Sequence, residues 1–172
     1  MKVAYADPPY PGCAALYRDH PDYAGEIDYP PLIARLLNEF DGFLLHTSST
    51  ELDYIIGLFP GRLKELGCRI MPWVKPFAAF KRNVSVAYAW EPCIVKACRK
   101  PVVTKRMVMR DWIAESITLK RGLVGVKPQK VCLWAFEMLG LQPTDELVDL
   151  YPGSGAVTAA WEAWRTQFAE VA

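Results

Sequence analysis

Short apolar runs, each closed by proline, glycine or polar residues, alternate along the chain with longer segments in which apolar residues recur every three or four positions. The short runs predict buried strands, and they cover residues 3–6, 43–46, 68–74, 89–96 and 146–150. The periodic segments predict helices, and they cover residues 30–40, 50–58, 127–139 and 158–169. Strands that alternate with helices are typical of an α/β fold with a largely parallel sheet and helices on both of its faces. Because proline cannot donate a hydrogen bond, Pro92 inside the run 89–96 predicts a bulge or an edge strand.

Two of the predicted strands end in residues that carry chemistry. The first strand runs into Asp7-Pro8-Pro9-Tyr10, where the prolines force the backbone out of the sheet in a fixed extended shape. The last strand runs through Asp149 into Tyr151-Pro152-Gly153-Ser154-Gly155, a glycine turn before a helix. In open α/β sheets, ligands bind at the carboxyl ends of the strands. We therefore expect the two strand ends to lie side by side and to form one active site.

The composition is that of one ordinary globular domain over residues 1–172, with 52% apolar residues and a formal net charge of +1. No apolar run approaches the roughly 18 residues that a membrane span requires. Met1-Lys2-Val3 leads directly into the first strand, so we expect no signal peptide and a cytoplasmic protein. Five cysteines without a CxxC pair, and only two histidines, indicate buried reduced thiols and no metal site.

Charge is distributed unevenly along the chain. Residues 96–130 contain ten basic side chains against two acidic ones, Asp111 and Glu115. Such a segment is either a solvated surface or a surface for a phosphate backbone, and the sequence leaves both interpretations open. Since residues 97–126 have little periodicity, we treat them as a candidate insert that contacts nucleic acid. The candidate nucleic-acid-binding residues, here and in the preceding loops, are Lys75, Lys81, Arg82, Arg99, Lys100, Lys105, Arg106 and Arg110.

The glycine turn alone indicates only a tight connection between a strand and a helix, but its combination with two other motifs is more specific. Asp7-Pro8-Pro9-Tyr10 resembles the catalytic tetrapeptide of the amino-group methyltransferases, which act on N6 of adenine or N4 of cytosine. Lys127-Pro128 resembles the Lys-Pro motif of these enzymes, and residues 149–155 resemble their S-adenosylmethionine (SAM) loop. The segments 73–76 and 90–95 are also similar to the middle of these families, so the resemblance spans nearly the whole chain.

The order of the motifs, with the catalytic tetrapeptide first and the cofactor loop last, resembles that of the permuted beta-type DNA adenine methyltransferases and the MT-A70-like enzymes, here in a minimal phage or bacterial form. The resemblance implies a circularly permuted and truncated Rossmann-like methyltransferase fold of about five strands. It implies SAM as cofactor and DNA as substrate, with cytosine-N4 methylation and RNA left open. The catalytic residues that it implies are Asp7, Pro8, Pro9 and Tyr10, and the cofactor-binding residues are Lys127, Pro128, Asp149, Tyr151, Pro152, Gly153, Ser154 and Gly155.

The sequence departs from the family pattern after its last helix. In a full methyltransferase sheet this helix leads into a further strand whose acidic end binds the ribose hydroxyls, and no such strand follows here. A homodimer or a partner subunit is one way to supply it. The aromatic residues of the last helix, Trp161, Trp164 and Phe168, belong either to the core or to such an interface. The alternative function is a nucleic-acid-binding subunit that keeps the fold without catalysis.

Overall fold

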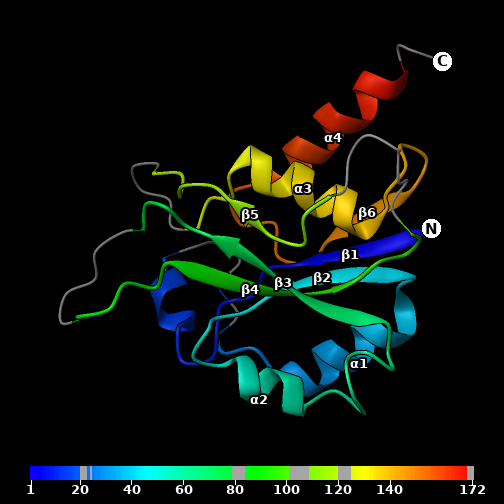
Figure 1. Cartoon of the computed structure of the whole chain (residues 1–172). Coiled ribbons are helices and arrows are strands. Elements are labelled where there is room, and N and C mark those ends of the chain that lie inside the picture. Colours follow the sequence, from blue (N-terminus) through cyan, green and yellow to red (C-terminus); the bar gives the residue numbers. More distant parts are fainter. Residues whose placement is uncertain (20–22, 24, 79–83, 101–108, 120–124, 170–172) are drawn as a thin grey trace.

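The computed structural model describes residues 1–19, 23, 25–78, 84–100, 109–119 and 125–169. Its centre is a six-stranded sheet with the strand order β5-β3-β4-β2-β1-β6 (Figure 1). The strands are β1 (Lys2–Ala6), β2 (Gly42–His46), β3 (Cys68–Val74), β4 (Trp90–Lys96), β5 (Ile113–Ala114) and β6 (Glu146–Asp149). The five strands expected from the sequence are confirmed. The sixth, β5, comes from the weakly patterned segment 97–126 and is only two residues long.

The sheet is largely parallel, as predicted. β1 pairs in parallel with both β2 and β6, and β3 pairs in parallel with β5. Only β4, among the described strands, runs against its neighbours, and it is antiparallel to both β2 and β3. Because β1 lies between β2 and β6, the carboxyl ends of these three strands meet at one edge of the sheet.

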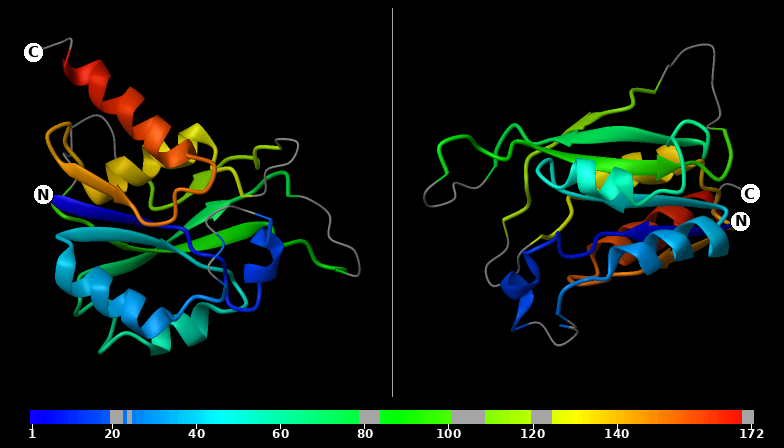
Figure 2. Two further views of the ribbon diagram at one scale, coloured as in Figure 1. Left: turned by 180° about the vertical axis from the view of Figure 1, so that it is seen from behind. Right: turned by 90° about the horizontal axis from the view of Figure 1, so that it is seen from below.

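Helices cover both faces of the sheet (Figure 1 and Figure 2). The helices α1 (Tyr29–Glu39) and α2 (Leu52–Gly57) lie on one face, and α3 (Gln129–Leu139) and α4 (Ala156–Ala169) lie on the other. Leu45 belongs to the core beneath α1, whereas its neighbour Leu44 belongs to the core beneath α3 and α4. A short 3-10 helix, η1 (Ala14–Tyr17), interrupts the long loop after β1. Within the described residues, none of the helices has the length and apolarity of a membrane span.

The helices α3 and α4 pack against each other through aromatic side chains. Trp161 and Trp164 are stacked with their ring centroids 5.2 Å apart, and the ring of Phe136 lies 5.4 Å from that of Trp161. Trp161 is 4% exposed and Trp164 is 9% exposed. Of the two interpretations of these tryptophans, the core is therefore confirmed. The side chain of Phe168 lies outside the part of the chain that the structure describes.

Pro92 lies neither at a bulge nor in an edge strand, so that prediction is wrong. β4 is an inner strand, and its register with β3 continues without interruption through the pair Pro72 and Pro92. The ladder between β2 and β4 ends at the pair His46 and Cys93, one residue before Pro92 is reached. The Pro92 carbonyl accepts a hydrogen bond from the Thr47 N–H at 3.0 Å. Proline is tolerated here because its missing N–H falls beyond the end of β2.

Candidate active site

The ends of β1 and β6 lie side by side at the carboxyl edge of the sheet. Tyr5 is the register partner of Asp149, and the Tyr5 carbonyl accepts a hydrogen bond from the Leu150 N–H at 2.9 Å. Asp7 follows two residues after Tyr5. Burial raises the pKa of Asp149, and the nearby negative charge of Asp7 adds to this effect. The predicted adjacency of the Asp7 tetrapeptide and the glycine turn is therefore confirmed.

Asp7 forms an ion pair with a buried lysine. Lys127 Nζ lies 2.8 Å from Asp7 Oδ2 and 3.1 Å from Glu91 Oε1, and the side chains of Lys127 and Glu91 are 6% and 5% exposed. Burial by itself would lower the pKa of Lys127, but the carboxylates of Asp7 and Glu91 outweigh it and raise that pKa above its ordinary value. Lys127 is therefore an ammonium that bridges two carboxylates.

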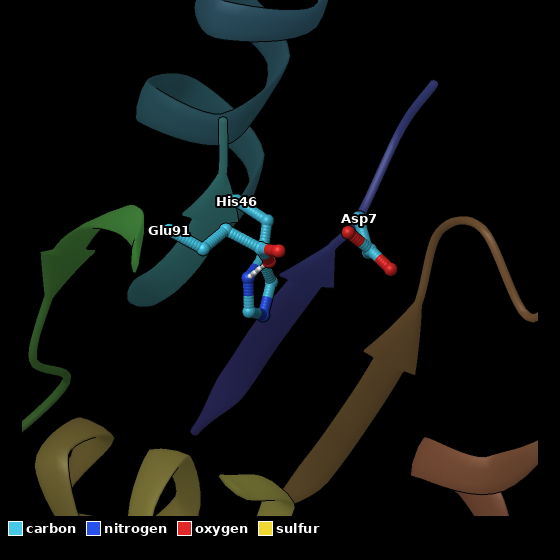
Figure 3. A group of neighbouring side chains, drawn as sticks. All are labelled: Asp7, His46 and Glu91. Atoms are coloured by element: carbon cyan, nitrogen blue, oxygen red, sulfur yellow. Dashed lines mark ion pairs between the residues drawn. The ribbon is translucent and has the colours of Figure 1, made fainter. Parts of the chain in front are cut away.

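Glu91 is the centre of this cluster. Its Oε2 lies 2.6 Å from Lys75 Nζ, and its Oε1 lies 2.6 Å from His46 Nδ1 (Figure 3). Burial alone would raise the pKa of Glu91, but Lys127, His46 and Lys75 together hold it well below its ordinary value. Glu91 is therefore an ionised carboxylate inside the protein, and two lysines balance its charge and that of Asp7.

Aromatic side chains close the cluster. Burial raises the pKa of the Tyr10 hydroxyl well above its ordinary value, and the nearby negative charge of Glu91 adds to this effect. The Trp73 ring lies beneath both ammonium groups, with its centroid 4.6 Å from Lys75 Nζ and 5.5 Å from Lys127 Nζ. Trp73 is itself fixed, because its Nε1 donates to the Glu115 carbonyl at 2.7 Å. Such cation–π contacts attract the ammonium groups to the face of the ring.

Asp7, His46 and Glu91 also form a group that could hold a metal ion, since one ligand atom from each lies within 4.8 Å of the others (Figure 3). The Lys127 ammonium already lies between the two carboxylates, and Lys75 faces the second oxygen of Glu91. A divalent cation would have to displace one buried ammonium and approach another. The donor set therefore fits a salt-bridge cluster rather than a metal centre.

The loop after β6 forms an open bend lined by glycine. Gly153 and Gly155 have φ values of 46° and 72°, and a Cβ built on Gly155 would meet no neighbouring atom within 4 Å. Asp149 accepts hydrogen bonds from the Tyr151 N–H and the Thr158 hydroxyl, both at 3.3 Å, so its carboxylate organises the bend. The bend leads into the amino terminus of α4, where the first N–H groups lack acceptors within the helix. A ligand with anionic or polar groups fits such a place.

The remaining predicted residues of the three motifs lie around the cluster and the bend. Pro8 is buried, and the Pro9 carbonyl accepts the Tyr29 hydroxyl at 2.9 Å. Pro128 is buried and occupies the position before the first turn of α3. In the bend, Pro152 and Ser154 are exposed, and the Pro152 carbonyl accepts the Gly155 N–H at 2.7 Å.

Arg99 occupies a different place from the one that its charge suggests. Its guanidinium binds the Gly140 carbonyl at 2.8 Å and the carboxylate of Asp145, directly before β6. The hydrogen bonds from Arg99 are the main reason why the pKa of Asp145 lies well below its ordinary value. The N-terminal ammonium also pairs with Asp145, at 2.9 Å. Arg99 therefore has a structural role at the amino edge of the sheet, opposite Asp7.

The other predicted basic residues are dispersed. Lys75 belongs to the Glu91 cluster. Lys100 is exposed, and the Arg110 guanidinium lies 5.3 Å from the centroid of the Trp112 ring. The remaining four, Lys81, Arg82, Lys105 and Arg106, lie outside the described residues.

Glu91 and His46 are the members of the cluster that sequence reasoning missed. Glu91 stands at the start of the apolar run of β4, and His46 is the last residue of the apolar run of β2. A titratable side chain within an otherwise apolar strand needs a buried partner. That signal is present in the sequence, but it does not name the partner, which depends on the register of β2, β3 and β4.

A comparison with known protein families finds no match, and no curated protein has a similar sequence. Among solved structures, the chain resembles the crystal structure of the M1.HpyAVI–SAM complex, with a TM-score of 0.58 and 20% sequence identity over 95% of this chain and 78% of the other. It also resembles the crystal structure of M1.HpyAVI, with a TM-score of 0.47 and 19% identity over 96% and 76% of the two chains. The first of these likenesses agrees with the sheet and helix layers described above. The chain therefore has a Rossmann-like methyltransferase fold.

Proposed function

We propose that the chain transfers a methyl group from SAM to the exocyclic N6 amino group of adenine in DNA. The observation that carries the proposal is the position of the Asp7 carboxylate at the end of β1, directly beside the glycine bend that follows β6. M1.HpyAVI, which has a similar fold, is a DNA adenine methyltransferase, and the matching structure is its complex with SAM. The permuted, MT-A70-like character of the chain is part of the same proposal.

Asp7 and Pro8 act on the acceptor. The amino group of adenine is a weak nucleophile because its lone pair is conjugated with the ring. Asp7 Oδ2 is held by Lys127, and in the proposal Oδ1 accepts one N–H of the amine while the Pro8 carbonyl accepts the other. These two acceptors favour a pyramidal nitrogen and stabilise the positive charge that develops on it. Because Tyr29 holds the next carbonyl, that of Pro9, little ordering of this backbone remains for the moment of reaction.

Tyr10 supplies the surface on which the base rests. A base turned out of the duplex stacks on an aromatic ring, a contact worth about 1–3 kcal/mol. The charge of Glu91 acts on the Tyr10 hydroxyl, so the ring adjoins the same cluster that holds Asp7. The acceptor carboxylate and the stacking ring are thus parts of one unit.

The bend after β6 is the proposed site of the cofactor, which supplies a methyl group on a sulfonium. Asp149, Gly153 and Gly155, together with the start of α4, would hold its methionine end, with Tyr151, Pro152 and Ser154 shaping the bend. Pro128 would line the same pocket. Lys127, which the resemblance implies as a cofactor-binding residue, bridges Asp7 and Glu91 with its ammonium. We therefore propose that Lys127 holds the acceptor carboxylate of Asp7 rather than the cofactor.

The proposed contacts to the phosphate backbone are Lys100 and Arg110, together with Lys81, Arg82, Lys105 and Arg106. Along the outer edge of β6 the described residues place no further strand. A groove of about 170 Å³ runs beside this edge, lined by residues of β6 and α4. A homodimer or a partner subunit would supply the strand that a full methyltransferase sheet has there. A cytoplasmic location stays a prediction.

The substitution Asp7→Ala is the direct test. The purified protein is incubated with labelled SAM and unmethylated DNA, and the modified nucleoside is identified by mass spectrometry. We expect N6-methyladenine from the wild type and a loss of about 100-fold or more in Asp7→Ala, with SAM binding preserved in calorimetry. Asp53→Ala, at an exposed position in the first turn of α2, is the matched control and keeps full activity.

The other outcomes separate the alternatives. Methyl transfer retained by Asp7→Ala would refute the mechanism. N4-methylcytosine as product, or modification of RNA alone, would move the proposal to those acceptors. Salt-dependent binding of DNA without any binding of SAM would identify a non-catalytic subunit.

A further inference from the structure

A chain of three buried polar side chains lies beneath the candidate acceptor site, and the proposed methyl transfer makes no direct use of it. The Tyr5 hydroxyl lies 2.7 Å from His46 Nε2, and His46 Nδ1 lies 2.6 Å from Glu91 Oε1 (Figure 3). Tyr5 and His46 are 0% exposed, and Glu91 is 4% exposed. Polar groups at this depth are costly unless they are paired, so each member of the chain depends on the next.

The neighbours of His46 hold its ring from both sides. Burial raises the pKa of Tyr5 well above its ordinary value, so the hydroxyl keeps its proton 2.7 Å from Nε2. Nδ1 faces the Glu91 carboxylate, with Cys93 Sγ 3.4 Å from the same nitrogen. His46 is therefore held between a hydroxyl at one ring nitrogen and a carboxylate at the other.

We propose that His46 is a positioning residue for the acceptor site and acts through Glu91, an inference that rests on the proposed methyl transfer. Glu91 Oε1 is shared by His46 and Lys127, while Oε2 faces Lys75. His46 thus fixes the rotation of the carboxylate, and the fixed carboxylate keeps the Lys127 ammonium between Glu91 and Asp7. Without His46, Glu91 turns toward Lys75. Lys127 then moves closer to Asp7 and neutralises more of the charge that Asp7 offers to the amine.

The charge of the same carboxylate also acts on the Tyr10 hydroxyl. A shift of Glu91 therefore disturbs the proposed stacking ring together with the acceptor carboxylate. His46 itself has no route to the substrate, since its side chain is 0% exposed. Tyr5, His46 and Glu91 have the composition of a hydroxyl–imidazole–carboxylate triad, but the burial of Tyr5 excludes attack by its hydroxyl. The role of the chain is positional.

Two substitutions at position 46 separate positioning from packing. His46→Asn keeps an N–H donor near the place of Nδ1, whereas His46→Leu fills the space without a donor. We expect His46→Leu to lower kcat about 10- to 100-fold, with the KM values for SAM and DNA unchanged, and His46→Asn to recover most of this loss. Phe43→Leu, in the same strand but in the core on the other face, is the matched control. It lowers the free energy of unfolding and leaves kcat per folded molecule unchanged.

Nitrogen NMR of the imidazole gives a readout that does not depend on activity. The chain has two histidines, so His20→Gln leaves only the signal of His46. We expect Glu91→Gln to change the Nδ1 signal more than the Nε2 signal, because Nδ1 is the nitrogen that faces Glu91. A spectrum that Glu91→Gln leaves unchanged overturns the proposal.

The kinetic outcomes are equally distinct. Equal kcat in His46→Leu and the wild type overturns the positioning role, and so do equal losses in His46→Leu and His46→Asn. Failure of the proposed function is recognised separately, because the wild type itself then transfers no methyl group to any nucleic acid. In that case the positioning role falls with it.

Discussion

Lys127 Nζ lies 2.8 Å from Asp7 Oδ2, which joins the segment before α3 to the end of β1. Both ends of this contact are removed from solvent, at 6% and 21% side-chain exposure, and the same ammonium also reaches Glu91. A buried ion pair adds little net stability compared with an apolar pair of the same shape. Removing one partner, in contrast, leaves an uncompensated charge in the interior. The cluster is therefore far more sensitive to single than to concerted substitutions.

Lys127→Met leaves the carboxylates of Asp7 and Glu91 without their shared cation. We expect it to lower the free energy of unfolding by about 3–5 kcal/mol, as for the loss of one partner of a buried pair, measured by urea denaturation. Lys130→Met is the control, because Lys130 is 77% exposed and forms its ion pair with Glu115 at the surface. Lys130→Met is expected to change the free energy of unfolding by no more than about 0.5 kcal/mol. Equal effects of the two substitutions would contradict the structural role of Lys127.

The pH dependence of stability follows from the opposite shifts of Glu91 and Lys127. The pKa of Glu91 is depressed below 4.5, so its contribution is present above pH 4.5 and is lost as the pH falls through the folded-state pKa. The pKa of Lys127 is raised above 10.5, so its contribution is complete below pH 10.5 and is lost as the pH rises through the folded-state pKa. Urea denaturation at a series of pH values measures the free energy of unfolding at both the acidic and the alkaline end. Glu91→Gln is expected to reduce the loss of stability at acidic pH. An unchanged loss would contradict the contribution of Glu91.

Gly140 ends α3 with a φ of 70°, and a Cβ at this position would overlap the Arg99 carbonyl. Gly140→Ala therefore combines a strained backbone with a backbone clash, and we expect a loss of at least about 2 kcal/mol in the free energy of unfolding. Gly57→Ala is the matched control, since Gly57 is the last residue of α2 and a Cβ there meets open space. It is expected to be neutral or to stabilise by up to about 1 kcal/mol. Thermal unfolding of the two variants measures the contrast, and a stable Gly140→Ala variant would contradict it.

Arg99 and Arg110 are expected to respond differently although both carry the same charge. Arg110→Ala removes a proposed phosphate contact, so the slope of log affinity for DNA against log salt concentration is expected to fall by about 0.9. Arg99→Ala leaves Asp145 without its main partner and is expected to cost about 2 kcal/mol of stability, with the salt slope unchanged. Fluorescence anisotropy at several salt concentrations gives both slopes. A reduced slope in Arg99→Ala would return this residue to the nucleic-acid surface.

The sequence predicts the parts of the fold that depend on local patterns. Pro30 and Pro31 in the first turn of α1, and Gly140 at the end of α3, mark helix limits that the structure reproduces. β5 is too short to give a pattern, because a strand of two residues has no alternation to read. The prediction of a bulge or an edge strand at Pro92 is wrong for a related reason. A single strand does not reveal that its neighbour β2 ends one residue earlier.

The candidate site, too, is only partly predictable from local patterns in the sequence. Asp7 and Asp149 are found from the sequence because each follows an apolar run and precedes a recognisable turn. The partners of Asp7 are not, since Lys127 lies within a motif that suggests the cofactor and Glu91 lies within a strand. Arg99 shows the converse difficulty. The many basic residues around it predict contact with DNA, whereas its guanidinium pairs with a single buried acid, Asp145.

The pairing of β1 with β6 joins residues 2–5 to residues 146–149, so the inner strand β1 has a sequence-distant neighbour at the edge of the sheet. During synthesis, one side of β1 stays open until β6 has emerged, so the two halves of the proposed site meet only after residues 146–149 have been made. Pairing between such distant segments is slow, and an open strand edge associates readily with other chains. Recovery of native protein is therefore expected to depend on the rate of synthesis and on chaperones that shield nascent β1.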